Sequence, residues 1–203
     1  MEKLNENDFA SLDTSRPIWS RFFMVAPLAV IGTREGGQYD LAPKHMVTPM
    51  GFGNYIGFVC TVRHSTYGNV MENGEFTVSY PLPDQTLVTG LSASPRGGPL
   101  GKSEKVLEYL PARMATTVDA PFLEDAYLLL ECSHFKTIDG FGENSLVTGK
   151  ILKAFVHPDY LRVSEQDEQK MLVDHPILAY VAEGRFARVG ETYAFPFPKG
   201  FKK

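Results

Sequence analysis

The chain has 203 residues, of which 43% are hydrophobic, and this length and composition favour one globular domain with its own core. The formal net charge of −4 argues against a nucleic-acid partner, because a surface that follows phosphates usually makes a domain basic. Residues 1–19 are polar and acidic, and the longest apolar run, residues 24–31, is interrupted by Pro27 and too short to cross a bilayer. We therefore expect a cytoplasmic protein that binds neither nucleic acid nor membrane.

Short apolar segments bounded by glycine and proline predict most of the secondary structure. In chain order, strands are expected at residues 22–33, 39–42, 55–62, 76–80, 113–118, 127–138 and 145–157, and residues 178–189 form a last segment. Turns are expected at residues 35–37 and 139–142, and residues 46–53 should be irregular. Because long amphipathic helices do not separate the strands, a mainly β fold with short helices is favoured over a parallel βαβ sheet.

Short helices are expected between some of the strands. One should begin at Ser65 and Thr66 and end at Asn73-Gly74, where glycine suits a left-handed cap. Others are expected at residues 82–91, 103–110 and 166–173. The Gly- and Pro-rich loop at residues 92–101 is as compatible with a lid over a binding site as with a plain surface crossover.

The two ends of the chain match no strand pattern. We predict a single domain over residues 1–203, with an N-terminal arm at 1–20 and a C-terminal arm at 190–203. Prolines alternate with aromatic residues in the tail at 195–201, which prevents regular structure there. We expect this tail to lie across a surface, and a neighbouring subunit would offer one.

A group of side chains suited to phosphate follows the strand expected at residues 55–62. Thr61, Arg63, Ser65 and Thr66 would be brought to a helix N-terminus, where backbone N–H groups lack intrahelical partners. A guanidinium can also pair bidentately with a phosphate. The sequence therefore indicates an anion site at this strand-to-helix junction.

The same side chains also have a structural interpretation. The hydroxyls could simply cap the helix. Arg63 could be an exposed strand-end charge that forms an ion pair, for which Glu72 and Glu75 are candidates. Cys60 and Cys132 lie in apolar segments, which predicts two buried reduced thiols. The alternative is that they form a redox pair or that one of them is a nucleophile.

Several parts of the chain together resemble a known family. The motif T-x-R-x-S-T-Y at residues 61–67, followed by a helix and G-E-F-T-V at 74–78, resembles the flavin reductase-like proteins, which bind FMN in a split β-barrel. The segment D-L-A-P at 40–43 is similar to the family's Asn-x-Ala-Pro segment, and V-T-G-K-I at 147–151 is similar to its late barrel strand. The resemblance covers residues 25–188 and implies a split β-barrel of Greek-key type.

The resemblance also implies a cofactor and its contacts. FMN would be bound, with NADH or NADPH as the electron donor, and no side chain is assigned as catalytic because the flavin carries the chemistry. Lys44 or His45 would supply a positive charge beside the flavin ring, and Asp40, which replaces the family's Asn, would point away or contact a ring donor. The predicted cofactor-binding residues are Lys44, His45, Met46, Thr61, Val62, Arg63, His64, Ser65, Thr66 and Lys102.

The roles of two of these predicted cofactor-binding residues, and of one further residue, are less well defined. His64 stands where the family varies, and Lys102, in the Gly-rich loop, could equally be an ordinary surface lysine. Arg185 could lie near the flavin or at a dimer contact. The histidines show no metal-ligand spacing such as H-E-x-x-H, so no metal is expected.

The implied function is an FMN-dependent oxidoreductase of the NAD(P)H:flavin reductase type, acting through flavin N5 as a homodimer. One alternative is a non-catalytic FMN-binding or electron-transfer protein on the same barrel. The other is an enzyme similar to pyridoxamine-phosphate oxidase, whose substrate phosphate would need a second basic cluster that the sequence does not show.

Overall fold

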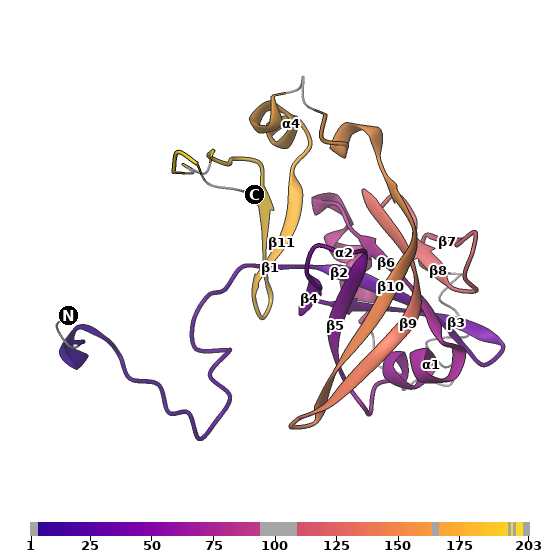
Figure 1. Ribbon diagram of the computed structural model, residues 1–203, viewed down its shortest axis with the longest axis horizontal. Helices are drawn as coiled ribbons and strands as arrows, with labels where there is room; N and C mark the ends of the chain where they lie inside the picture. Colours follow the sequence, from indigo (N-terminus) through magenta and orange to yellow (C-terminus); the bar gives the residue numbers. More distant parts are fainter. Residues whose placement is uncertain (1–3, 94–108, 164–166, 195, 197, 201–203) are drawn as a thin grey trace.

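The computed structural model describes residues 4–93, 109–163, 167–194, 196 and 198–200. Its main element is an antiparallel sheet of seven strands (Figure 1). In spatial order these are β3 (Gln38–Lys44), β2 (Ala29–Glu35), β6 (Glu75–Tyr80), β9 (Leu128–Phe141), β10 (Asn144–Val156), β5 (Tyr55–Thr61) and β4 (Val47–Pro49). With only short helices beside them, these strands confirm the predicted mainly β split barrel.

The chain closes this sheet on itself through a very short connection. β3 and β4 are the two ends of the strand order, yet only His45 and Met46 separate them in the sequence. In a flat sheet, six strand spacings of about 4.8 Å would place the two edges about 29 Å apart. Three Cα–Cα steps span at most about 11 Å. The sheet must therefore curl until its edges approach each other.

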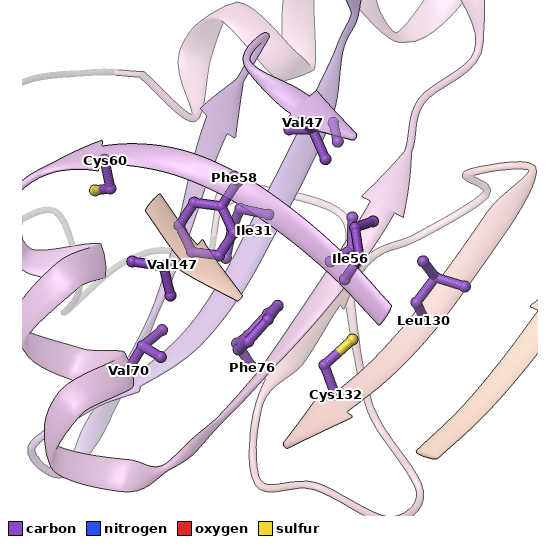
Figure 2. Packing of buried hydrophobic residues seen from close by; sticks show 12 residues of the cluster. Ile31, Val47, Ile56, Phe58, Cys60, Val70, Phe76, Leu130, Cys132 and Val147 are labelled. Atoms are coloured by element: carbon purple, nitrogen blue, oxygen red, sulfur yellow. The ribbon is translucent and has the colours of Figure 1, made fainter. Parts of the chain in front are cut away.

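Curling places the apolar faces of the strands around a common core (Figure 2). The rings of Phe58 and Phe76 meet edge to face at its centre, with centroids 5.4 Å apart, and neither is exposed. Burying each ring contributes about 1.5–3 kcal/mol. Gly149 leaves room for this pair, because a Cβ there would lie 2.4 Å from Cζ of Phe76. The core comprises Ala29, Ile31, Val47, Ile56, Phe58, Cys60, Val70, Phe76, Val78, Leu130, Cys132 and Val147.

The helix predicted after β5 is present with the expected limits. α1 (Ser65–Asn73) ends at Gly74, whose φ of 70° lies in the left-handed region and whose N–H donates to the carbonyl of Val70 at 2.9 Å. The strands predicted on either side of it are also confirmed as β5 and β6. Local capping and periodicity were sufficient here because each signal is contained within a few residues.

The strand predicted at residues 22–33 is wrong in its extent. It divides at Leu28 into β1 (Ala26–Pro27) and β2, which belong to different sheets. β1 joins β11 (Ile177–Ala182) and β12 (Arg185–Val189) in a three-stranded sheet. The last segment, at 178–189, forms a hairpin, which turns at Gly184 with φ of 70°.

Three other boundaries also differ from the predictions. Residues 46–53 are not wholly irregular, because β4 adds to the edge of β5. The strand expected at 113–118 stops early: β7 (Ala112–Met114) pairs only with β8 (Pro121–Leu123). The turn expected at 139–142 is shorter, since β9 continues to Phe141 and β10 starts at Asn144.

The remaining helices whose limits lie within the described ranges are short. They are the 3₁₀ turns η1 (Glu6–Asp8), η2 (Pro83–Gln85) and η4 (Pro158–Tyr160), together with α2 (Thr86–Leu91) and α4 (Glu168–Asp174). α2 and α4 match predicted helices, whereas most of the helix expected at 103–110 and most of the loop at 92–101 lie outside the described residues. In the part of the chain that the structure describes, no helix is both long enough and apolar enough to span a bilayer.

The N-terminal segment extends away from the barrel (Figure 1). From residue 4 to residue 25, its described part, η1 is the only regular element, and Phe9, Trp19 and Phe23 are 63%, 60% and 72% exposed. A hydrogen bond from the Met24 N–H to the carbonyl of Val181 attaches it to β11. The division of the chain into one domain with two arms stays a prediction.

A buried carboxylate holds the turn that follows β7. Glu131 of β9 is fully buried, and its oxygens accept the N–H groups of Thr116, Thr117 and Val118 at 2.6–3.2 Å and the Thr116 hydroxyl at 2.8 Å. Burial acts to raise the pKa of Glu131, but these hydrogen bonds outweigh it and hold the pKa below its ordinary value of 4.5. The turn is therefore pinned to β9 by an ionised side chain.

We predict that Glu131→Gln lowers the free energy of unfolding by roughly 2–3 kcal/mol, since the amide NH₂ would face backbone donors. Because the folded pKa is depressed, the contribution of Glu131 is complete above pH 4.5 and is lost as the pH falls toward the folded pKa. Urea unfolding of the variant should therefore show a weaker dependence on pH in this range. Glu124→Gln, at an exposed ion pair with Arg113, is the matched control and should cost less than about 1 kcal/mol. Equal losses from the two variants would contradict the anchoring role.

Candidate functional site

The structure brings the two predicted halves of the site together. Residues 44–46 are the connection that closes the barrel, and β5 runs beside it: the Val59 N–H donates to the carbonyl of Met46 at 2.9 Å. The Lys44 ammonium contacts the thiol of Cys60, one residue before Thr61. Two segments that are 16 residues apart therefore form one corner of the barrel, where β5 ends and α1 begins.

The side chains of Lys44 and His45 differ in charge at neutral pH. The imidazole of His45 stacks on Tyr180 of β11, with ring centroids 4.2 Å apart and planes 18° from parallel. Burial, followed by the nearby charge of Lys44, lowers the pKa of His45 below its ordinary value of 6.5. His45 is therefore neutral at pH 7, and Lys44 is the member of this pair that carries a positive charge.

Arg63 forms an ion pair, but with neither of the expected partners. Its guanidinium pairs with the carboxylate of Glu143, in the turn between β9 and β10, and the two side chains are 70% and 72% exposed. The Thr61 hydroxyl donates to the main-chain carbonyl of Glu143 at 2.9 Å. Arg63 thus remains accessible to a ligand from solvent, although a carboxylate already occupies part of its donor set.

The start of α1 offers further donors. His64 occupies the N-cap position, and Ser65 and Thr66 lie inside the first turn, so neither hydroxyl is at the capping position. Ser65 is half-buried, whereas Thr66 is only 2% exposed and is the member of the set that solvent reaches least. No acidic residue lies in the first turn of α1, so its positive dipole end is not neutralised from within the helix.

These groups fit a phosphate monoester in their chemistry. A guanidinium, a hydroxyl and the first N–H groups of a helix are donors that bind phosphate, and the Lys44 cation lies on the same corner. Glu143 is the group that opposes an anion there. The exposed side chains of Val62 and Met46, at 49% and 43%, add apolar surface at its edge.

Other predicted positions are placed as follows. Lys102 lies outside the described residues. Asp40 is buried in β3 opposite Thr33, which is consistent with a carboxylate that points away from a surface ligand. Arg185 is exposed at the start of β12, in the hairpin that carries Tyr180. No cluster of potential metal ligands is found within the ranges that the structure describes.

Both cysteines are free and buried, as the prediction of two buried reduced thiols expects. Burial raises the pKa of the Cys60 thiol, and the charge and hydrogen bond of Lys44 only partly offset this. Burial and then the charge of Glu131 raise the pKa of Cys132 to about 12. Neither thiol is therefore a thiolate at neutral pH, which argues against the nucleophile alternative.

Sequence reasoning missed two residues of this corner. Tyr180 is 135 residues from His45, and nothing local indicates their stacking. Glu143 could have been found from the hairpin: once β10 is paired with β5, Asn144 lies opposite Thr61, and the preceding turn residue must lie near Arg63.

Comparison with known proteins gives a consistent result. The family model described as "Flavin reductase like domain" matches residues 20–183. A search of curated proteins by sequence finds no match. Among solved structures, 2-nitrobenzoate 2-nitroreductase NbaA of Pseudomonas fluorescens has a TM-score of 0.75 at 19% identity, over 100% of this chain and 99% of that one.

Two further structures extend the comparison. Flavoredoxin from Methanosarcina acetivorans has a TM-score of 0.73 at 21% identity, over 95% of this chain and 97% of its own. An FMN-binding protein from Thermus thermophilus, solved with bound p-hydroxybenzaldehyde, has a TM-score of 0.74 at 19% identity, over 93% and 100%. At these identities the likeness shows a shared fold.

We predict that Arg63→Ala weakens FMN binding about tenfold, or about 1.4 kcal/mol, by removing a charge-assisted contact with the phosphate. Riboflavin, which lacks the phosphate, should bind equally well to both proteins. Titration by flavin fluorescence measures both affinities. Arg162→Ala, at another exposed ion pair, is the matched control and should change neither. Unchanged FMN affinity together with a lower melting temperature of the flavin-free protein would mean that Arg63 is only a structural ion-pair partner.

Proposed function

Because the chain belongs to the flavin reductase-like family, whose model covers residues 20–183, we propose that it is an FMN-binding oxidoreductase of the NAD(P)H:flavin reductase type. The observation that carries the proposal is the corner where Lys44 contacts Cys60, shortly before Arg63 and the start of α1. A phosphate site and a cation for a reduced ring are the two requirements that a protein meets when it binds and tunes FMN.

The residues of this corner have separate roles in the proposal. Arg63, Ser65 and the first N–H groups of α1 would bind the phosphate. The charge of Lys44 would offset negative charge on the reduced ring, whereas the neutral His45 would contribute surface and hydrogen bonding. When bound, FMN supplies a site at N5 that accepts hydride from NADH or NADPH and later passes electrons to an acceptor.

Two alternatives use the same fold. A non-catalytic FMN-binding or electron-transfer protein would have the same corner but would not oxidise NAD(P)H. An enzyme similar to pyridoxamine-phosphate oxidase needs further free basic side chains for a second phosphate. Three exposed arginines already form ion pairs and are not free for this role: Arg34 with Asp119, Arg113 with Glu124 and Arg162 with Glu168.

We expect the purified protein to bind FMN with the absorbance of an oxidised flavin, and at least tenfold more tightly than riboflavin. Adding NADH or NADPH without oxygen should bleach this absorbance, which a spectrophotometer records directly. Binding without bleaching by either nucleotide would select the non-catalytic alternative. Equal affinities for FMN and riboflavin would reject the phosphate site.

We also propose a homodimer, because large apolar side chains are exposed in the single chain. Phe135, Ile138 and Phe141 of β9 are 53%, 41% and 56% exposed, and Trp19 and Phe23 of the N-terminal segment are 60% and 72% exposed. Large apolar side chains that a single chain leaves exposed can be covered by a second copy. Light scattering at micromolar concentration should give twice the mass of one chain, which is 22.6 kDa. The mass of a single chain would refute the proposal.

A further inference from the structure

Glu143 takes up several of the donors at the proposed phosphate site. Its main-chain carbonyl accepts the Thr61 hydroxyl at 2.9 Å and the Val62 N–H at 3.4 Å. Its carboxylate forms the ion pair with Arg63. One residue thus places both an acceptor and a full negative charge where the anion of a ligand would be bound.

The position of Glu143 is fixed by the sheet. β10 and β5 are antiparallel with Asn144 opposite Thr61, and the turn that precedes Asn144 therefore lies over the end of β5. The main-chain contacts of Glu143 belong to the backbone and would persist whatever its side chain. Only the carboxylate and its pair with Arg63 depend on the residue being Glu.

We infer that Glu143 is a specificity-determining residue: its carboxylate competes with a phosphate group for Arg63 and limits the preference of the chain for FMN over riboflavin. The inference rests on the proposed FMN site. It concerns the strength and selectivity of that site, not its existence.

The competition between the carboxylate and a phosphate is a matter of charge. When a phosphate approaches Arg63, the carboxylate of Glu143 either leaves the guanidinium, which breaks an ion pair, or stays, which brings two anions together. Either course raises the free energy of the FMN complex and leaves that of the riboflavin complex unchanged. Because the two side chains are 70% and 72% exposed, water screens the effect. Glu143 therefore weakens FMN binding without blocking it.

A supporting role of the Glu143 carboxylate in phosphate binding would have the opposite effect on FMN affinity. If the carboxylate instead held Arg63 in the orientation that phosphate needs, removing its charge would weaken FMN binding. Glu143→Gln distinguishes the two, because glutamine keeps the size and the main-chain contacts and loses only the charge.

The experiment is a titration of the full chain and of Glu143→Gln with FMN and with riboflavin. We expect FMN affinity to rise threefold to fivefold, about 0.7–1 kcal/mol, with riboflavin affinity unchanged. Glu168→Gln is the matched control, since it removes the same charge from another exposed ion pair, with Arg162, and should leave both affinities unchanged. In 1 M salt, where the Debye length is about 3 Å, the gain from Glu143→Gln should shrink.

The outcomes separate this inference from the function on which it rests. Unchanged or weaker FMN binding in Glu143→Gln, while Arg63→Ala still loses FMN, would overturn the competition and leave the phosphate site intact. An equal gain in Glu168→Gln would also overturn it, because net charge alone would then explain the result. Unchanged FMN binding in Arg63→Ala would reject the phosphate site itself, and the inference with it. Thermal melting of the flavin-free variants confirms that each is folded.

Discussion

The two-residue connection between Lys44 and Val47 constrains the whole molecule. β3 and β4 form opposite edges of a seven-stranded sheet, and a chain of three Cα–Cα steps cannot bridge the width of that sheet if it is flat. The sheet has to curl, and the hydrogen bond from Val59 to the carbonyl of Met46 holds the connection against β5. The core around Phe58 and Phe76 is what the curled sheet encloses.

The same closure assembles the candidate site. β3 and β5 are separated by four strands in the spatial order, so in a flat sheet Lys44 would lie far from the end of β5. In the barrel Lys44 contacts Cys60, next to Thr61 and the start of α1. A cation from one edge and an anion site from near the other are therefore neighbours only because the barrel closes.

The β9–β10 hairpin links three features that serve different purposes. At its base, Glu131 holds the turn at Thr116 with its buried carboxylate. Cys132 and Val147 contribute to the core, and Glu143, in the turn at the tip, pairs with Arg63. The two carboxylates of this hairpin thus have opposite environments. Glu131 is buried and accepts hydrogen bonds from backbone N–H groups, whereas Glu143 is exposed and forms a solvent-accessible ion pair. Burial and the number of donors decide which of them is structural.

The sequence by itself determined the elements whose signals are local. The limits of α1 follow from Gly74, and the strands on either side from runs of apolar residues. The order and spacing of the phosphate-suited residues were enough to indicate the family. Only the tertiary structure decided which residues meet across the sheet. Arg63 pairs with Glu143, 80 residues away, rather than with Glu72 or Glu75, and the strand expected at 22–33 divides between two sheets. The physical reason is that capping and periodicity act within a few residues, whereas side-chain partners depend on strand order and register, which the closure of the whole barrel sets.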